Sequence, residues 1–305
     1  MISNINAPGQ QFLAAISQLQ SNLNRTQLQL SSGLKVSTPS DAPDEVSAIL
    51  QLHANIQANQ QATSNLKNVQ NEVQTADQGI SSVTTLLDQV QTLASQGLGL
   101  DTTAATRANL AGQVQSITQQ IVAISQTTFE GRYIYSGNSD QAPSYQYDPS
   151  TQSVTRLQVG TATRQVADAS GATFPVSLSA NQIFDVRDAN DNPTTGNVFA
   201  ALSAVTSALQ ANDPSALQTA LSSLGDASTY VNQQQTFYGA TENRITQALS
   251  VASQAAISSQ QDLSDKQDAD LTSAILEMTQ GTTNLQAAMA SFGKMPHTSL
   301  FSELS

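Results

Sequence analysis

The sequence predicts a mainly α-helical fold, in which a long antiparallel helical rod carries a terminal coiled-coil pair and a small inserted β-rich domain. Long stretches place apolar side chains at steps of three and four residues, the spacing that puts them on one face of a helix. Charged residues make up only 11% of the chain, which suits thin helices with uncharged polar surfaces. Of the 6 Tyr and 8 Phe, eight lie between residues 129 and 199, which marks the insertion.

The first expected helix runs from about residue 10 to residue 31, after ten residues without a clear period. Ser32-Gly33 marks its end, because glycine readily adopts the left-handed conformation that closes helices. A narrow stripe of the kind that forms a coiled-coil seam runs along this helix. Its members, with one threonine among them, are Phe12, Ile16, Leu19, Leu23, Thr26 and Leu30.

A loop rich in turn residues, 36–43, separates this helix from a much longer one. We expect Asp44 and Glu45 in the first turn of the long helix, where carboxylates suit the helix dipole, and a break at Gly97-Leu98-Gly99. The stripe of the long helix consists of Leu66, Val69, Val73, Ala76, Ile80, Val83, Leu87 and Val90. A third helix has the stripe Leu110, Val114, Ile117, Ile121 and Ile124.

The inserted domain is predicted to contain a hairpin, with strands at 145–147 and 154–159, and a further edge strand at 174–178. Strand residues alternate between two faces, so one face of these strands would form a separate small core. Its expected members are Tyr145, Tyr147, Val154, Leu157, Val159 and Val176.

Helical spacing resumes near Val198, with a helix that starts at Asp213-Pro214 and carries Leu217, Leu221 and Leu224. A very long helix is expected from about Ala227, with Ile245, Leu249, Ala252, Ala256 and Leu263 on its stripe. The step from Leu263 to Leu271 is eight residues, which predicts a break there. The last stripe consists of Leu271, Ile275, Met278, Thr282, Leu285, Met289 and Phe292.

Three domains follow from this pattern: a terminal coiled-coil domain of 1–40 plus 265–305, a helical rod of 41–137 plus 201–264, and the insertion at 138–200. Both terminal stripes would expose apolar surface on isolated helices, which are marginal in water at this length. We therefore expect these ends to order only in an assembly or on a partner that shields them. The expected assembly seam comprises the apolar members of the two stripes: Phe12, Ile16, Leu19, Leu23, Leu30, Leu271, Ile275, Met278, Leu285, Met289 and Phe292.

Composition excludes several classes of function. The net charge is −12 and the basic residues are scattered singly, so nucleic-acid binding is not expected. We also expect no membrane span, because no apolar run approaches 20 residues. The first residues lack a basic and an apolar signal region, so we expect a protein that is not a Sec substrate, and the chain has no cysteine for disulfides or thiol chemistry.

The polar residues do not form a recognisable catalytic, metal or cofactor site, and we expect none. His53 and His297 are the only histidines, so a zinc site or a histidine-based triad would have to be built from these two alone, and His53 has no second ligand near it in sequence. The segment 188–192 begins like a calcium loop, but Pro193 replaces the expected glycine and Phe199 the expected glutamate. We interpret it as a turn between a strand and a helix.

Three segments resemble the bacterial flagellin family. Residues 28–43, LQLSSGLKVSTPSDAP, are similar to its N-terminal signature, and residues 269–280 with 284–288 are similar to its C-terminal helix. Residues 129–137, FEGRYIYSG, look like the hook–filament junction branch of the family. Flagellin proper usually has an Asn-Gly and a Leu-Leu pair near that point, and the tail 294–304 also lacks flagellin's usual ending. The likeness covers about residues 1–140 and 225–305.

The resemblance implies an extracellular flagellar subunit that is exported unfolded, without a cleaved signal peptide, through the type III channel. Expected partners are further copies of the chain in a ring, the first hook-associated protein, flagellin, and an export chaperone on the C-terminal helix. Alternatives are a minor flagellin that polymerises along the filament and, from another class, a cytoplasmic coiled-coil scaffold. An enzyme is the least supported reading.

Overall fold

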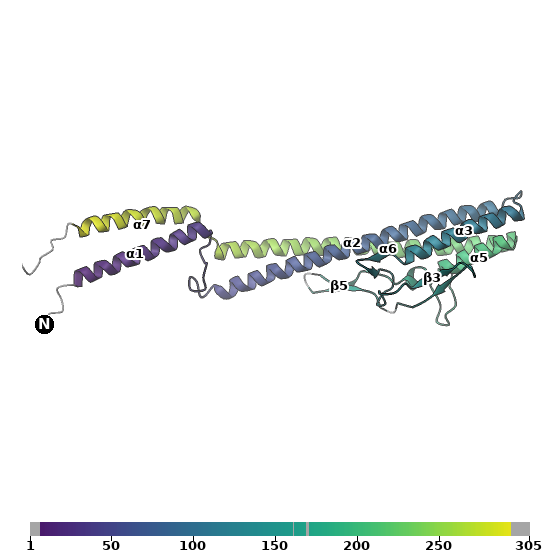
Figure 1. The fold of residues 1–305 in the computed structure, drawn as a ribbon, viewed down its shortest axis with the longest axis horizontal. Coiled ribbons are helices and arrows are strands. Elements are labelled where there is room, and N and C mark those ends of the chain that lie inside the picture. The colour runs from purple at the N-terminus through teal and green to yellow at the C-terminus, as the bar shows by residue number, and fades with distance from the viewer. Residues whose placement is uncertain (1–6, 161, 169–170, 294–305) are drawn as a thin grey trace, which may run out of the picture. The chain divides into compact units, whose positions relative to one another are not determined.

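The computed structural model describes residues 7–160, 162–168 and 171–293, and it confirms the mainly α-helical fold with small β elements (Figure 1). The helices are α1 (Ala7–Ser32), α2 (Val46–Gly97), α3 (Ala104–Ser125), α4 (Ala180–Ile183), α5 (Val198–Gln210), α6 (Pro214–Gln267) and α7 (Leu271–Phe292). The strands are β1 (Thr128–Phe129), β2 (Arg132–Tyr133), β3 (Tyr145–Asp148), β4 (Ser153–Arg156), β5 (Gln165–Ala167) and β6 (Thr173–Pro175). Within the described residues, β1 pairs with β2, β3 with β4 and β5 with β6, which gives three antiparallel two-stranded sheets.

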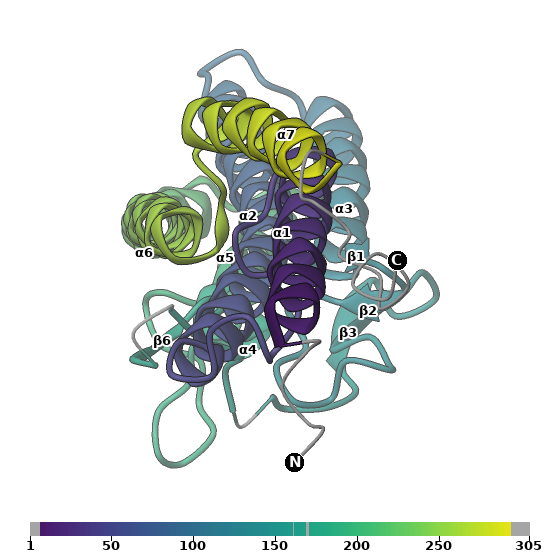
Figure 2. The same cartoon turned by 90° about the vertical axis from the view of Figure 1, so that its left-hand side faces the viewer.

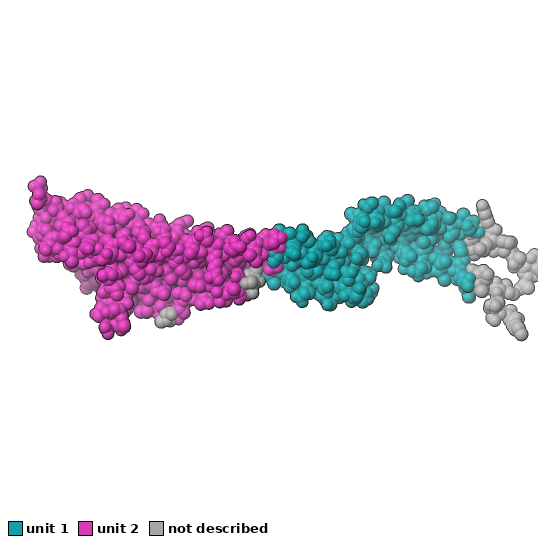
Figure 3. Space-filling model, turned by 180° about the vertical axis from the view of Figure 1, so that it is seen from behind, with its two compact units in different colours: residues 1–58, 255–305 teal, residues 59–254 magenta. Residues whose placement is uncertain are grey.

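The chain forms two compact units, coloured separately in Figure 3. Unit 1 contains residues 1–58 and 255–305, and unit 2 contains residues 59–254. The long helices α2 and α6 contribute residues to both units. The finer division into three domains stays a prediction.

Most predicted helix ends are confirmed by the backbone. Gly33, with φ of +72°, follows the last residue of α1, and α2 ends at Gly97. Arg107 fixes the end of α2. Its Nε donates to the Gly97 carbonyl at 2.7 Å, and its Nη1 donates to Asn212 Oδ1 at 2.6 Å. Pro214 opens α6, where the missing N–H of proline costs no helical hydrogen bond.

Three predicted boundaries are wrong. Helix α1 already begins at Ala7, and Asp44 and Glu45 precede α2, which begins at Val46. The two helices expected after residue 213 are one, since α6 runs unbroken through Ala227 to Gln267. Leucines 217, 221 and 224 therefore belong to the same helix as Ile245.

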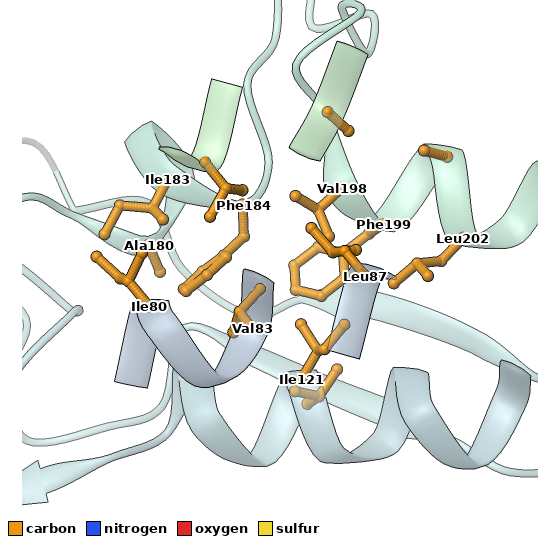
Figure 4. Close-up of a cluster of buried hydrophobic side chains, with 14 of the residues drawn as sticks. Ile80, Val83, Leu87, Ile121, Ala180, Ile183, Phe184, Val198, Phe199 and Leu202 are labelled. Carbon is orange, nitrogen blue, oxygen red and sulfur yellow. The ribbon is translucent and has the colours of Figure 1, made fainter. Parts of the chain in front are cut away.

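Unit 2 is built around one continuous apolar core. The stripe of α2 from Leu66 to Val90 is buried along its length, and it packs against residues of α3, α4 and α5 (Figure 4). The close-up shows Ile80, Val83 and Leu87 from α2 facing Phe184, Val198 and Phe199. Aromatic pairs complete the packing, with ring centroids 5.7 Å apart for Tyr135 and Phe184 and 4.9 Å apart for Tyr145 and Phe199.

The β-rich segment does not have the separate core that the sequence predicts. Tyr145, Phe174 and Val176 are buried in the same cluster as the helix stripes. Leu157 and Val159, predicted to be inside, are 50% and 43% exposed. The alternation of apolar and polar residues predicts the hairpin correctly, but it does not predict which core the hairpin joins, because the helices supply the surface that covers these strands.

Tyrosine hydroxyls attach this segment to the long helices. Tyr135 donates to the Ala76 carbonyl of α2 at 2.6 Å, and Tyr230 of α6 donates to the Gln182 carbonyl at 2.9 Å. The Leu178 N–H donates to the hydroxyl of Tyr238 at 3.2 Å. Tyr135 and Tyr238 are fully buried, and buried polar groups must find partners, so these bonds fix where the segment lies on the helices.

Candidate assembly surface

The terminal helices α1 and α7 lie side by side in unit 1, as both ribbon views show (Figure 1; Figure 2). The stripe of α1 predicted from the sequence, which runs from Phe12 to Leu30, is its less exposed face. Thr26, the polar interruption, is 7% exposed, and its hydroxyl donates to the Asn22 carbonyl of its own helix at 3.0 Å. A threonine is therefore accommodated in this seam without an unpaired hydroxyl.

On α7 the face that packs against α1 differs from the predicted stripe. Ala274 is buried, and a Cβ added to Gly281 would lie 2.7 Å from the Cδ2 of Leu23. Ala274, Gly281 and Ala288 repeat every seven residues, so small residues line this face and allow a close approach of the two helices. Met278 and Leu285 belong to the same face and are half-buried.

The rest of the predicted α7 stripe is exposed on the flank of that face. Leu271, Ile275 and Met289 are 49%, 57% and 58% exposed. The apolar face of α7 is thus wider than the surface that α1 covers. We call Leu271, Ile275 and Met289 the apolar flank of α7; the side chain of Phe292 lies outside the described residues.

The predicted stripe of α7 passes beside the three small residues, because it follows the line of the large apolar side chains. Their heptad spacing was the available signal. Small residues mark the line on which α1 packs, while Leu271, Ile275 and Met289 lie on the neighbouring line and stay exposed.

The seam is flanked by a polar groove of about 590 Å³ within unit 1. Arg25 and Lys35 line it from the side of α1, and Asp270 and Glu277 from the side of α7. Asp270 caps α7 by accepting from the N–H groups of Thr272 and Ser273 and from the Ser273 hydroxyl. These bonds, led by the one from the Ser273 side chain, lower the pKa of Asp270.

A second group of charged residues lies in unit 2 and is internally paired. Asp185 is buried and accepts from Arg187 Nε at 2.8 Å, from Asn197 Nδ2 at 2.6 Å and from the Tyr145 hydroxyl at 3.3 Å. Arg156 donates to both carboxylate oxygens of Asp191, at 2.8 and 2.7 Å. The hydrogen bonds and ion pairs of this cluster hold the β3–β4 hairpin against the turn before α5.

That turn, 188–192, is confirmed as a turn: Asp188 accepts from the N–H groups of Asn190 and Asn192. His53 is exposed on α2, while His297 lies outside the described residues. Among the residues that the structure describes, there is no group of three or more acidic, His or Cys side chains placed to hold a metal ion. Nor is any helix of this part of the chain long and apolar enough to cross a membrane.

Comparisons with known proteins identify what the chain is similar to. Residues 3–140 match the profile of the bacterial flagellin N-terminal helical region. Comparison with curated protein sequences gives no match. A flagellar hook-associated protein from Vibrio parahaemolyticus has a similar structure, with 18% identity, a TM-score of 0.66 and coverage of 75% of this chain and 100% of that chain.

Two further solved structures are similar. Bacillus cereus FlgL has 20% identity and a TM-score of 0.56, over 72% of this chain and 100% of that chain. Flagellar hook-associated protein 3 from Legionella pneumophila has 12% identity and a TM-score of 0.60, over 72% and 98%. The profile match confirms the flagellin-like character of residues 3–140, and the structural likeness shows a shared fold.

Proposed function

Because residues 3–140 match the flagellin N-terminal helical region, we propose that this chain is a structural subunit of the bacterial flagellum. In this proposal it forms an adaptor ring that joins the hook, through the first hook-associated protein, to the flagellin filament. The similar structures described as hook-associated proteins support a position at the junction over a position along the filament. A structural rather than enzymatic role agrees with the internally paired charges of unit 2.

The observation that carries the proposal is the apolar flank of α7. Leu271, Ile275 and Met289 are each about half exposed although α1 is already docked on the same helix. Removing apolar surface from water contributes about 25 cal/mol per Å², so contact with a neighbouring copy along this flank would stabilise an assembly. The seam of large residues at both termini then has two functions, pairing within the subunit and packing between subunits.

The same flank has to be shielded before assembly. In the proposal an export chaperone covers α7 in the cell, and the subunit then leaves unfolded through the flagellar type III channel without a cleaved signal peptide. Residues 1–40 plus 265–305 would form the inner core of the ring. Residues 41–137 plus 201–264 would form the surrounding rod, with 138–200 as its outer part.

The test is complementation of a strain that lacks the gene. We expect the deletion strain to secrete monomeric flagellin, and the parent gene to restore attached filaments. Ile275→Lys puts a charge on the exposed flank without touching the core, so we expect secretion of the variant without filament attachment. Thr283→Lys is the matched control: it is exposed on the far side of α7 and should complement like the parent.

Other results would contradict the proposal. Short but attached filaments in the deletion strain would indicate that the chain is a minor flagellin that polymerises along the filament. Normal motility of that strain would exclude both flagellar roles. Full complementation by Ile275→Lys would show that the flank of α7 is not the assembly surface.

A further inference from the structure

The two connections that lead into the terminal helices are bound to each other. Leu34, just after α1, and Asp268, just before α7, form an antiparallel β-bridge. The Lys35 N–H donates to the Gln267 carbonyl at 2.7 Å, and the Ala269 N–H donates to the Gly33 carbonyl at 2.9 Å. Two pieces of chain that lie 231 residues apart in sequence are thereby held together.

An apolar side chain anchors this bridge. Val36 is 6% exposed and packs with Ile49 of α2 and Leu263 of α6, which are 7% and 6% exposed. Its backbone is held as well: the Val36 N–H donates to the Gln267 carbonyl at 3.2 Å, and Gln267 Nε2 donates to the Val36 carbonyl at 3.4 Å. Val36 thus connects the linker after α1 to both long helices.

The segments on either side of the bridge are also ordered by hydrogen bonds. Asp41 accepts from the N–H groups of Ser37 and Thr38 at 3.0 and 2.7 Å, which folds the linker after Val36. Asp270 caps α7 only two residues beyond the bridge. The last turn of α1 therefore ends just before the bridge, and the first turn of α7 begins just after it.

We propose that the bridge and Val36 form a latch that nucleates the pairing of the terminal helices. Most of the residues between α1 and α7 are folded in unit 2, and the latch fixes the connections on either side, so that only short segments remain to be brought together before α1 and α7 touch. Pairing then becomes local and proceeds as a zipper from Leu30 and Ala274 outward to the termini. This inference does not depend on which assembly the subunit builds.

The absence of cysteine from the sequence allows a clean test in the full-length chain. Leu23→Cys with Gly281→Cys places thiols at a contact of the seam. With an added mild oxidant, we expect fast disulfide formation in this double variant. In a Val36→Asp background the rate should fall at least tenfold, because the anchor is lost while the seam is unchanged.

A matched control is Leu50→Asp in the same double variant. Leu50 neighbours Ile49 in α2 but is 64% exposed, so the rate should stay within twofold of the parent. Far-UV circular dichroism and the thermal unfolding of unit 2 check that each protein is folded. If Val36→Asp fails this check, Val36→Ala replaces it, with a slowing of at least threefold expected.

The order of pairing is tested with a second pair. Ile16 lies seven residues before Leu23 on α1, and Ala288 lies seven residues after Gly281 on α7, so both are one heptad farther from the latch. Ile16→Cys with Ala288→Cys therefore reports the pairing of that outer part of the seam. If pairing proceeds from the latch outward, the outer pair should crosslink more slowly than the inner pair. Val36→Asp should lower the crosslinking rate of the outer pair at least tenfold as well. An outer pair that reacts faster than the inner pair, or an inner-pair rate that Val36→Asp leaves within twofold, would overturn the proposal.

Discussion

Units 1 and 2 bury their apolar residues in different ways. Unit 2 encloses large side chains completely, and Tyr135, Tyr145, Tyr238, Phe174 and Phe184 are all below 2% exposed. The buried apolar cluster of unit 1 that includes Val36 is small, with Ile49 and Leu263 as its other members. The terminal helices of unit 1 bury only one face and leave the apolar flank of α7 in solvent.

The difference indicates where stability is internal and where it depends on a partner. A helix in a protein is stabilised mainly by the packing of its apolar face. Unit 2 supplies that packing from its own residues, whereas α1 and α7 supply it to each other only in part. We therefore expect changes in unit 2 to alter folding and changes on the terminal helices to alter association.

The largest expected effect comes from replacing residues 138–200 with a short Gly/Ser linker. This removes Tyr145, Phe174, Phe184 and Phe199 from the shared core, so cooperative unfolding of unit 2 should be lost. Thermal unfolding followed by circular dichroism is the measurement. A retained transition close to that of the parent would show that the segment is an independent domain after all.

Truncation of one side chain in each unit should show the same difference in stability with a smaller change. Phe184→Ala removes a fully buried ring and should destabilise unit 2 by about 3–5 kcal/mol. Ile275→Ala on the exposed flank of α7 should change the free energy of unfolding by less than about 0.5 kcal/mol. Urea unfolding of both variants gives the comparison, and equal losses would mean that the flank is buried in the monomer.

The smallest effect is the response of the helix cap to acid. Hydrogen bonds lower the pKa of Asp270 below its ordinary value of 3.8, so the carboxylate stabilises the start of α7 above that pH. The contribution is lost as the pH falls through the lowered pKa of the folded state. In unit 2, hydrogen bonds led by those from Ser150 lower the pKa of Asp148 to about 2.

NMR titration of the backbone amides of Thr272, Ser273 and Ser150 would measure both groups. The first two amides should shift as Asp270 is protonated, and the Ser150 amide should shift near pH 2. Asp270→Asn is the matched control, because asparagine still caps the helix but does not titrate. Persistence of the Thr272 and Ser273 shifts in that variant would assign them to another group.

The sequence by itself determined the elements whose signals are local. The stripe from Leu66 to Val90 is apolar at helical spacing and is buried as predicted, and Gly33, Gly97 and Pro214 mark helix boundaries through their own backbone preferences. The hairpin at 145–156 follows from alternation and turn residues in the same way. Such features depend on near neighbours in the chain, so a single sequence contains enough information to locate them.

Only the tertiary structure decided what covers each apolar face. The spacing of Leu271, Ile275 and Met289 predicts an apolar line on α7, yet α1 docks on the neighbouring line of Ala274 and Gly281. Likewise, the alternation in the β segment could not reveal that Tyr145 and Phe174 share a core with α2, nor that Val36 joins Ile49 and Leu263 from far along the chain. Burial is a contact between distant segments, and periodicity along one segment shows that a surface is apolar without showing which partner removes it from water.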